Sequence, residues 1–523
     1  MEGIVDTVVL IVIAVTGAAL ARRLGFVAPL VLLVAGLGLS FVPGLPEIHV
    51  EPELVLVGIL PPLLYVAALQ TSIPAFRKLL RPIMLLAVGL VIFTALITGF
   101  LLHLLLPDVP LAACVALGAV VAPPDAVSAT AIARRIGLPR RIVTLLEGES
   151  LLNDATALVM VRIAGGALTG AAVGFWDISK DIVVIAGGGL ALGFGAAVLA
   201  AALHKKIKDP LLDDAVSLLT PFVVVVVAEE LHTSSVVAVV VAGLYLGHRI
   251  PYLLSPTSRL QMEAVWRLIT FLLEGAVFLM VGLQLRELVG DLETGLVTTV
   301  QATLLVFGSI VVLRFVWMYP ATYLARLIPR VRSREERPSP AGPTVVAWAG
   351  MRGVVTLAAV LTLPSVEKVP GGYPRDLFVF VAFAIIVLTL LIQGTSLPFL
   401  ANRLGVREDT STADALAEAA VQNRASRAAL EALEENVDGA PDSVVERLRA
   451  IAENRNNGAW ERLGSQEQET PSAAYSRLRR EMIIAERHVF KIARNEGRIP
   501  EEVLTRAQRD LDLEESQLNR SDD

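Results

Sequence analysis

The chain has 523 residues, of which 54% are hydrophobic and only 18% are charged, and its formal net charge is −6. A soluble protein of this size would carry about a quarter charged residues, so the composition excludes an ordinary soluble globular protein. No nucleic-acid partner is expected. Apolar stretches fill residues 4–400, whereas residues 401–523 are polar. These features predict a polytopic membrane domain, 1–400, followed by a polar carboxyl-terminal tail, 401–523.

Thirteen apolar segments are long enough to cross a bilayer, at about 20 residues for each crossing. The first could pass for a signal peptide, but no basic residues precede it and Arg22–Arg23 follow it, so we expect a retained span. The predicted spans, in chain order, are 4–21, 25–42, 53–70, 82–106, 110–134, 143–168, 181–203, 212–231, 234–250, 265–286, 295–325, 343–364 and 376–398.

Basic residues cluster after every odd-numbered span, and the alternate loops carry few or none. Such alternation is what the positive-inside rule predicts. It places the amino terminus outside the cell membrane and the carboxyl terminus in the cytoplasm. The clusters are Arg22–Arg23, Arg77–Lys78–Arg81, Arg134–Arg141, His204–Lys208, His248–Arg259, Arg326–Arg337 and Arg403–Arg407.

Two of the spans, 110–134 and 343–364, should be broken helices. Pro123 and Pro124 remove two backbone donors near the middle of the first, and Gly350 and Gly353 flank Arg352 in the second. The two spans are seven apart in order, so they run in opposite directions. Paired interruptions of this kind are typical of secondary transporters built from inverted repeats, here 4–168 and 212–398.

The segment "GESLLNDATALVMVRI", residues 148–163, places carboxylates inside an apolar helix. Ser150 and Asp154 are four residues apart and share a helix face, while Glu149 and Asn153 share the adjacent one. An ionised carboxylate at this depth costs at least about 2.5–3.5 kcal/mol, so it needs water, a cation or a proton. Asp154 and Ser150, with Asp125 or carbonyl groups from the first break, would form an oxygen-lined site for a monovalent cation that competes with a proton.

Other roles remain open for the same residues. Glu149 is best explained as the buried partner of Arg352. Asp125 would either contact the ion or cap a half-helix. Asn153 would either contact the ion or bond to another helix. The remaining intramembrane charges, Glu274, Arg162 and Arg314, are expected to be mostly structural, with Glu274 the least settled of them.

Four segments resemble the cation:proton antiporter 1 family, the sodium/proton exchangers: "APPDAVSATAI", "FLLEGAVFLMVGLQL", "EGESLLNDATALV" and "WAGMRGVVTLAAVLTLP". The resemblance covers about residues 5–400. It implies an all-α fold of thirteen spans with two crossed, unwound helices, and a homodimer that exchanges Na⁺ and H⁺ by alternating access. It assigns Asn153 and Asp154 to the ion site, with Asp154 as the alternating carrier. It also places Asp125 at the crossing, Ser150 among the ligands, and Glu149 beside Arg352.

The third span departs from the family pattern. Many members carry an acid in "LPPLLFE"-like stretches, whereas this chain reads "LPPLLYVAAL" and has Val66 at the matching position. The absence of that carboxylate leaves open an exchanger for K⁺ in place of Na⁺ or Li⁺.

Residues 401–523 should form four helices, separated near Gly439–Pro441, Gly458–Gln468 and Gly497–Pro500.

A cation channel could also line a pore with acids, but it would not need paired broken helices. A membrane enzyme is disfavoured because no metalloprotease or serine-hydrolase motif is present, and Cys114 is the only cysteine. No cofactor is predicted, and the expected partners are the transported ions, membrane lipid and a second copy of the chain.

Overall fold

The computed structural model describes residues 12–21, 23, 27–42, 52–169, 175–290, 292, 294–324, 339–369, 372–406, 410–437, 439–461 and 470–522. Several sequence predictions fall outside these residues. They are the start of the first span (4–11), Arg22, the basic cluster Arg326–Arg337, Arg407, and residues 462–468 of the second tail break.

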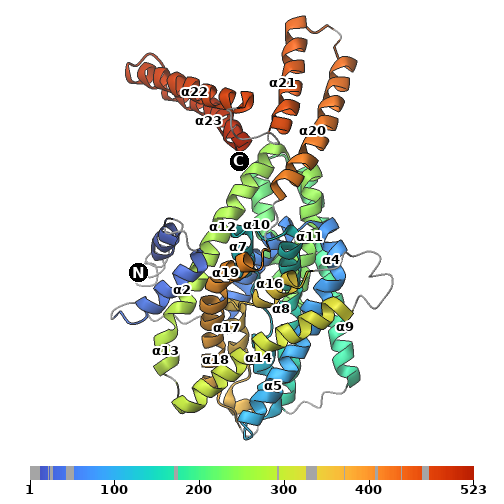
Figure 1. Cartoon of the computed structure of the whole chain (residues 1–523), viewed down its shortest axis with the longest axis vertical. Helices are drawn as coiled ribbons and strands as arrows, with labels where there is room; N and C mark the ends of the chain where they lie inside the picture. The colour runs from blue at the N-terminus through green and yellow to red at the C-terminus, as the bar shows by residue number, and fades with distance from the viewer. Residues whose placement is uncertain are drawn as a thin grey trace. The chain divides into compact units, whose positions relative to one another are not determined.

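The described residues are helical and contain no strand, so the predicted all-α class is confirmed. The chain divides into two compact units, Met1–Glu408 and Asp409–Asp523. Figure 1 shows the helices of both units as ribbons coloured along the chain. The helices of the first unit are α2 (Ala28–Leu39), η1 (Leu54–Ile59), α3 (Leu60–Gln70), α4 (Ile73–Met84), η2 (Leu85–Leu90), α5 (Val91–Leu105), α6 (Leu111–Val121), α7 (Ala126–Arg135), α8 (Arg140–Leu168), α9 (Phe175–Lys206), α10 (Pro210–Glu230), α11 (Ser235–Leu253), α12 (Pro256–Leu283), α13 (Leu285–Gly290), α14 (Leu296–Tyr323), α16 (Ala341–Trp348), α17 (Val354–Leu361), η4 (Val366–Lys368), α18 (Arg375–Leu388), η5 (Thr389–Gly394) and α19 (Thr395–Arg403).

Among the described residues, eight continuous helical runs have the length and apolar composition needed to cross a membrane. Four further apolar helices are shorter: Val12–Ala21, Ala28–Leu39, Leu54–Gln70 and Leu111–Val121. The total of thirteen crossings stays a prediction. The long runs are Ile73–Leu105, Arg140–Leu168, Val183–Lys206, Pro210–Glu230, Ser235–Leu253, Pro256–Gly290, Leu296–Tyr323 and Arg375–Arg403.

Several of the helices begin where the sequence supplies a capping residue. Asp209, Ser234 and Ser255 accept a backbone N–H at the starts of α10, α11 and α12. These oxygens satisfy amide groups that have no partner within the helix, which matters most where little water is available. Proline follows the cap directly in α10 and α12, where its missing N–H is not needed.

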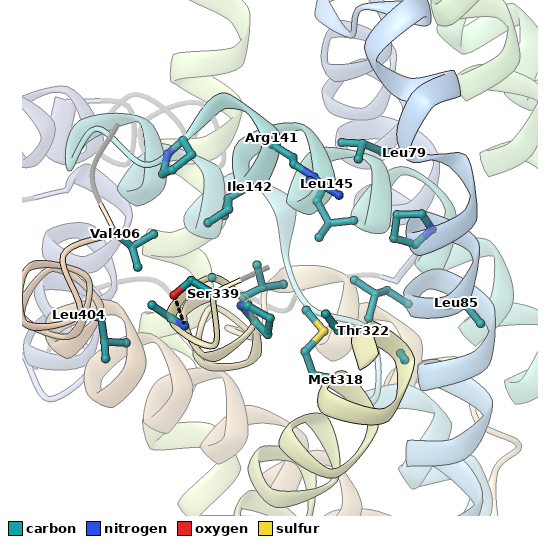
Figure 2. A pocket seen from close by; sticks show the side chains of 18 of the residues that line it. Leu79, Leu85, Arg141, Ile142, Leu145, Met318, Thr322, Ser339, Leu404 and Val406 are labelled. Carbon is teal, nitrogen blue, oxygen red and sulfur yellow. Dashed lines mark hydrogen bonds between the residues drawn. The ribbon is translucent and has the colours of Figure 1, made fainter. Parts of the chain in front are cut away.

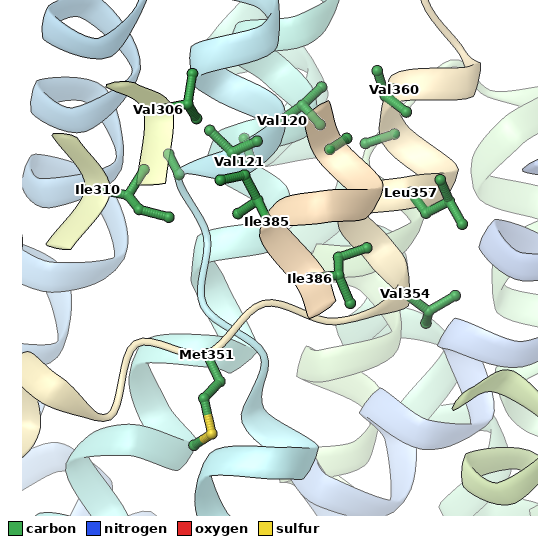
Figure 3. Packing of buried hydrophobic residues seen from close by; sticks show 14 of the residues in the cluster. Val120, Val121, Val306, Ile310, Met351, Val354, Leu357, Val360, Ile385 and Ile386 are labelled. Carbon is green, nitrogen blue, oxygen red and sulfur yellow. The ribbon is translucent and has the colours of Figure 1, made fainter. Parts of the chain in front are cut away.

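Close helix contacts hold the first unit together. A side chain at Gly282 of α12 would lie 2.5 Å from the Leu33 carbonyl of α2, so the two backbones approach directly. The largest buried apolar cluster includes residues of α6, α17 and α18. Figure 3 shows Val120 and Val121 of α6 beside Ile385 of α18. This packing surrounds the two places where helices are broken, and so fixes the position of the polar groups there.

The second unit contains four helices, α20 (Thr410–Glu435), α21 (Asp442–Glu461), α22 (Pro471–Asn495) and α23 (Glu501–Asp522). Gly458 lies inside α21, so this helix ends later than the sequence predicted. Ile483 of α22 packs with Leu511 of α23 in a small apolar cluster. Arg479 donates two hydrogen bonds of 2.6 Å to the Glu514 carboxylate, and these bonds lower the pKa of Glu514. Both pairs join α22 to α23.

Because each unit has its own apolar cluster, we expect a chain ending at Arg407 to fold without residues 408–523. Its thermal unfolding temperature in detergent should stay close to that of the full chain, and it should elute as a single symmetric peak. Aggregation of the shortened chain under conditions in which the full chain is stable would contradict this separation into two units.

Candidate functional site

The two predicted helix breaks lie against one another. The first separates α6 from α7 at residues 122–125, and the second separates α16 from α17 at residues 349–353. The Asp125 amide donates a 2.6 Å hydrogen bond to the Met351 carbonyl, so the backbones of the breaks are in contact. A Cβ at position 353 would lie 2.6 Å from the carboxylate carbon of Asp125 and 2.8 Å from its Oδ1. Gly353 therefore allows this close crossing.

Arg352 satisfies carbonyl groups that the breaks leave without a helical partner. Its guanidinium donates to the carbonyls of Val121 (2.8 Å) and Ala122 (3.2 Å), and also to that of Gly350. Val121 is the last residue of α6, so a buried cation lies at the negative end of this half-helix. Arg352 is only 2% exposed, and these carbonyls compensate its charge.

Asp125 lies at the start of the other half-helix. Its carboxylate accepts a 2.9 Å hydrogen bond from the backbone N–H of Ser128 in the first turn of α7. This is the contact of a helix cap, which was one of the two roles the sequence left open. The side chain is also half-buried, so capping does not remove it from the polar region around the breaks.

Helix α8 brings three of the predicted ligands to the first break. The Asn153 side-chain amide donates to the Pro124 carbonyl at 3.0 Å, and the Ser150 hydroxyl reaches the same carbonyl at 3.4 Å. Asp154 is next along the helix and only 5% exposed. The Asn153 side-chain oxygen is buried and has no hydrogen-bond partner among the described residues. Hydroxyl, side-chain amide and backbone carbonyl groups thus meet at the first break, and the Asp154 carboxylate follows them directly along α8.

The prediction that Glu149 pairs with Arg352 is wrong, because the partner of Glu149 is Arg314. Glu149 accepts two hydrogen bonds, of 2.6 and 2.8 Å, from the guanidinium of Arg314 in α14. Both side chains are about 3% exposed or less. Arg352 donates to the carbonyls of the broken helices instead. Arg314 faces the Glu149 carboxylate with two N–H groups, the bidentate geometry of a strong ion pair. We expected a structural role for Arg314 from the sequence, but the sequence alone could not show which helix it faces.

Two further carboxylates influence the site from other elements. Asp125 lies close enough to Asp154, and also to Glu274 of α12, for their charges to interact. Helix α3 contributes no carboxylate. Val66 instead belongs to the same buried apolar cluster as Leu151 of α8. The acids of the site therefore come from the first break, α8 and α12.

The chain is similar in sequence and in fold to known membrane transporters. A family profile described as "Sodium/hydrogen exchanger, transmembrane" matches residues 10–403. A Mycobacterium tuberculosis protein named as an uncharacterized Na⁺/H⁺ exchanger is 34% identical over 99% of this chain and 96% of its own. A sodium, potassium, lithium and rubidium/H⁺ antiporter of Bacillus pumilus is 30% identical over 77% of this chain and 62% of its own. The structure of the sodium proton antiporter MjNhaP1 from Methanocaldococcus jannaschii, 19% identical, has the same fold, with a TM-score of 0.63 over 78% of this chain and 100% of that chain.

The Glu149–Arg314 pair predicts a large effect of single substitutions on stability. Removing either partner leaves a buried charge without compensation, which typically costs about 3–5 kcal/mol. We therefore expect Glu149→Ala and Arg314→Ala each to lower the unfolding temperature of the purified protein strongly.

Two further variants serve as references for the size of this loss of stability. Removing both charges together, in Glu149→Gln with Arg314→Met, should lower the unfolding temperature less than either single truncation. Arg134→Ala breaks the pair between exposed Arg134 of α7 and half-buried Glu147 of α8, and should change stability by at most about 1 kcal/mol because the arginine is open to solvent. Single truncations of Glu149 or Arg314 as harmless as Arg134→Ala would mean that the pair does not support the fold.

Proposed function

Because this chain belongs to the sodium/hydrogen exchanger family, we propose that it exchanges one monovalent cation for one proton through the carboxylate of Asp154. As a member of that family it is a multi-span secondary transporter of cations and protons, and not an enzyme.

The observation that carries the proposal is the position of Asp154 on α8, directly beside the first helix break. A carboxylate that is 5% exposed in a membrane-spanning helix is costly in its bare ionised form. Either a proton or a monovalent cation removes that cost. Hard cations bind oxygen ligands, and Ser150, the Asn153 side-chain oxygen and the Pro124 carbonyl are in position to complete a small oxygen site.

Cation movement and proton movement are coupled if the two ions cannot bind Asp154 at the same time. A proton on Asp154 neutralises the charge that attracts the cation, and a bound cation disfavours protonation. The carboxylate then crosses from one side to the other loaded with one ligand or the other, as alternating access requires. Asp125 keeps its place as the cap of α7, and Arg352 keeps its carbonyl partners through the cycle.

Na⁺ is the cation that we propose, with K⁺ as the second candidate. The observation that favours the second is Val66, which supplies an apolar side chain where the family pattern has an acid. A site with fewer carboxylates holds a cation less tightly, and this disfavours the small, strongly hydrated Na⁺ more than the larger K⁺. The Bacillus pumilus relative is itself named for four alkali cations.

We also propose an orientation in the membrane and an oligomeric state. The basic clusters favour an amino terminus outside the cell membrane and a carboxyl terminus in the cytoplasm. We further infer a homodimer in which the membrane unit carries out exchange, with a role in pH homeostasis. The polar tail, Asp409–Asp523, has no part in the ion chemistry proposed here.

The direct test is Asp154→Asn, which keeps the shape of the side chain but can no longer ionise. In proteoliposomes this variant should lose proton flux driven by Na⁺, Li⁺ or K⁺, with its unfolding temperature maintained. Glu147→Gln is the matched control, because Glu147 lies on the same helix and pairs with exposed Arg134. The control should keep exchange. Normal cation-driven flux in well-folded Asp154→Asn would remove Asp154 from the mechanism.

A further inference from the structure

A cavity of about 430 Å³ lies at one end of the membrane unit, away from the ion site (Figure 2). Its volume falls within the range of about 300–1,000 Å³ that is usual for ligand pockets. The lining residues come from α4, η2, the start of α8, the end of α14, the start of α16 and the chain after α19. Arg141, at the α8 edge, is about 20 Å from Asp154 along the helix, at 1.5 Å per residue.

The polar part of this cavity favours a negative charge. Arg81, in the last turn of α4, and Arg141, in the first turn of α8, both line it. The amino-terminal ends of two helices also border it, α8 at Pro139 and α16 at Gly342. The partial positive charge of a helix amino terminus adds to that of the arginines. Two arginines and two helix amino termini, all carrying positive charge or partial positive charge, therefore border the same cavity.

The remaining wall is apolar. It is formed by aliphatic side chains and one methionine: Leu79, Leu85, Leu86, Ile142, Leu145, Met318, Val346 and Val406. Figure 2 shows Arg141 close to Leu79 and Leu145 at one edge, with Met318 on the opposite side. A small inorganic anion would contact the arginines and leave this wall empty. A ligand with an acidic head and a hydrocarbon chain would satisfy both.

The location matches the depth at which lipid headgroups lie. Arg81 and Arg141 belong to basic clusters at span ends, which the charge alternation assigns to the cytoplasmic side. Both side chains are exposed, as expected for arginines that extend toward the membrane surface. Basic pockets between helices on that side are a known form of anionic lipid recognition.

We propose that this cavity is a binding site for an anionic phospholipid of the cytoplasmic leaflet. The phosphate lies between Arg81 and Arg141, and the first part of one acyl chain lies along the apolar wall. The lipid joins the ends of α4, α8, α14 and α16. Two of these helices, α8 and α14, also carry the Glu149–Arg314 pair, so bound lipid stabilises the bundle that holds the ion site.

The test measures lipid retained by the full-length purified protein, using native mass spectrometry after detergent exchange. Phosphatidylglycerol should remain bound to the parent and raise its unfolding temperature, whereas phosphatidylcholine should do neither. Arg81→Ala with Arg141→Ala should weaken phosphatidylglycerol binding at least about tenfold, since charged hydrogen bonds are lost. Arg77→Ala with Lys78→Ala, on the same helix but outside the cavity, should bind it like the parent.

A second variant fills the cavity without changing charge. A Cβ added at Gly342 would meet only the Ile142 side chain within 4 Å, at 4.0 Å, and Gly342 lines the cavity, so Gly342→Leu is designed to occupy the space of the acyl chain. It should fold and yet lose bound phosphatidylglycerol. Equal retention of lipid in all variants, or of phosphatidylcholine in the parent, would overturn the proposal. So would equal stabilisation by oleate or by inorganic phosphate alone, which would assign the cavity to a free fatty acid or a free anion.

Discussion

The cost of placing charge among apolar helices is the constraint on which the rest of the structure depends. Each buried ionic group needs compensation, because the membrane interior offers no water to supply it. Arg352 receives it from the carbonyls at the end of α6, and Glu149 from Arg314. Asp154 is deeply buried and lacks a cationic partner of this kind among the described residues. Asp214 in the first turns of α10 also lacks one, but of the two only Asp154 lies beside the helix break. In our account, the missing cation and the position at the break together distinguish the working carboxylate from the structural charges.

The broken helices make this separation possible. An intact helix uses its carbonyls internally, whereas a break exposes them to other groups. Here the Val121 and Ala122 carbonyls go to Arg352, while the Pro124 carbonyl faces Ser150 and Asn153. One break therefore supplies both a fixed electrostatic support and part of the proposed ion site. The cavity lined by Arg81 and Arg141 lies nearer the membrane surface, where we propose that an anionic lipid supplies the negative charge.

Much of the fold could be predicted from the sequence, because apolar length and helix-breaking residues act locally. The breaks at Pro123–Pro124 and Gly350–Gly353 are of this kind. The partner of Glu149 could not be predicted, since it depends on which helix faces α8 across the bundle. Arg352 and Arg314 are both buried arginines in apolar spans, and only tertiary packing distinguishes them. The contact between Gly353 and Asp125 is likewise visible only once the two breaks are seen to cross.

The central claim is that a single carboxylate, Asp154, carries either one cation or one proton. The bundle then crosses with the same charge in both directions, although Asp125 and Glu274 lie near enough to add a second titrating group. The most direct measurement is the equilibrium of Na⁺-driven proton exchange in liposomes, with the membrane potential set by potassium and valinomycin. A net charge would be driven by about 2.3 kcal/mol per 100 mV. Our account predicts an equilibrium that does not move with the potential. An equilibrium that shifts with it would show that more than one carboxylate takes part, and would contradict the single-carrier mechanism.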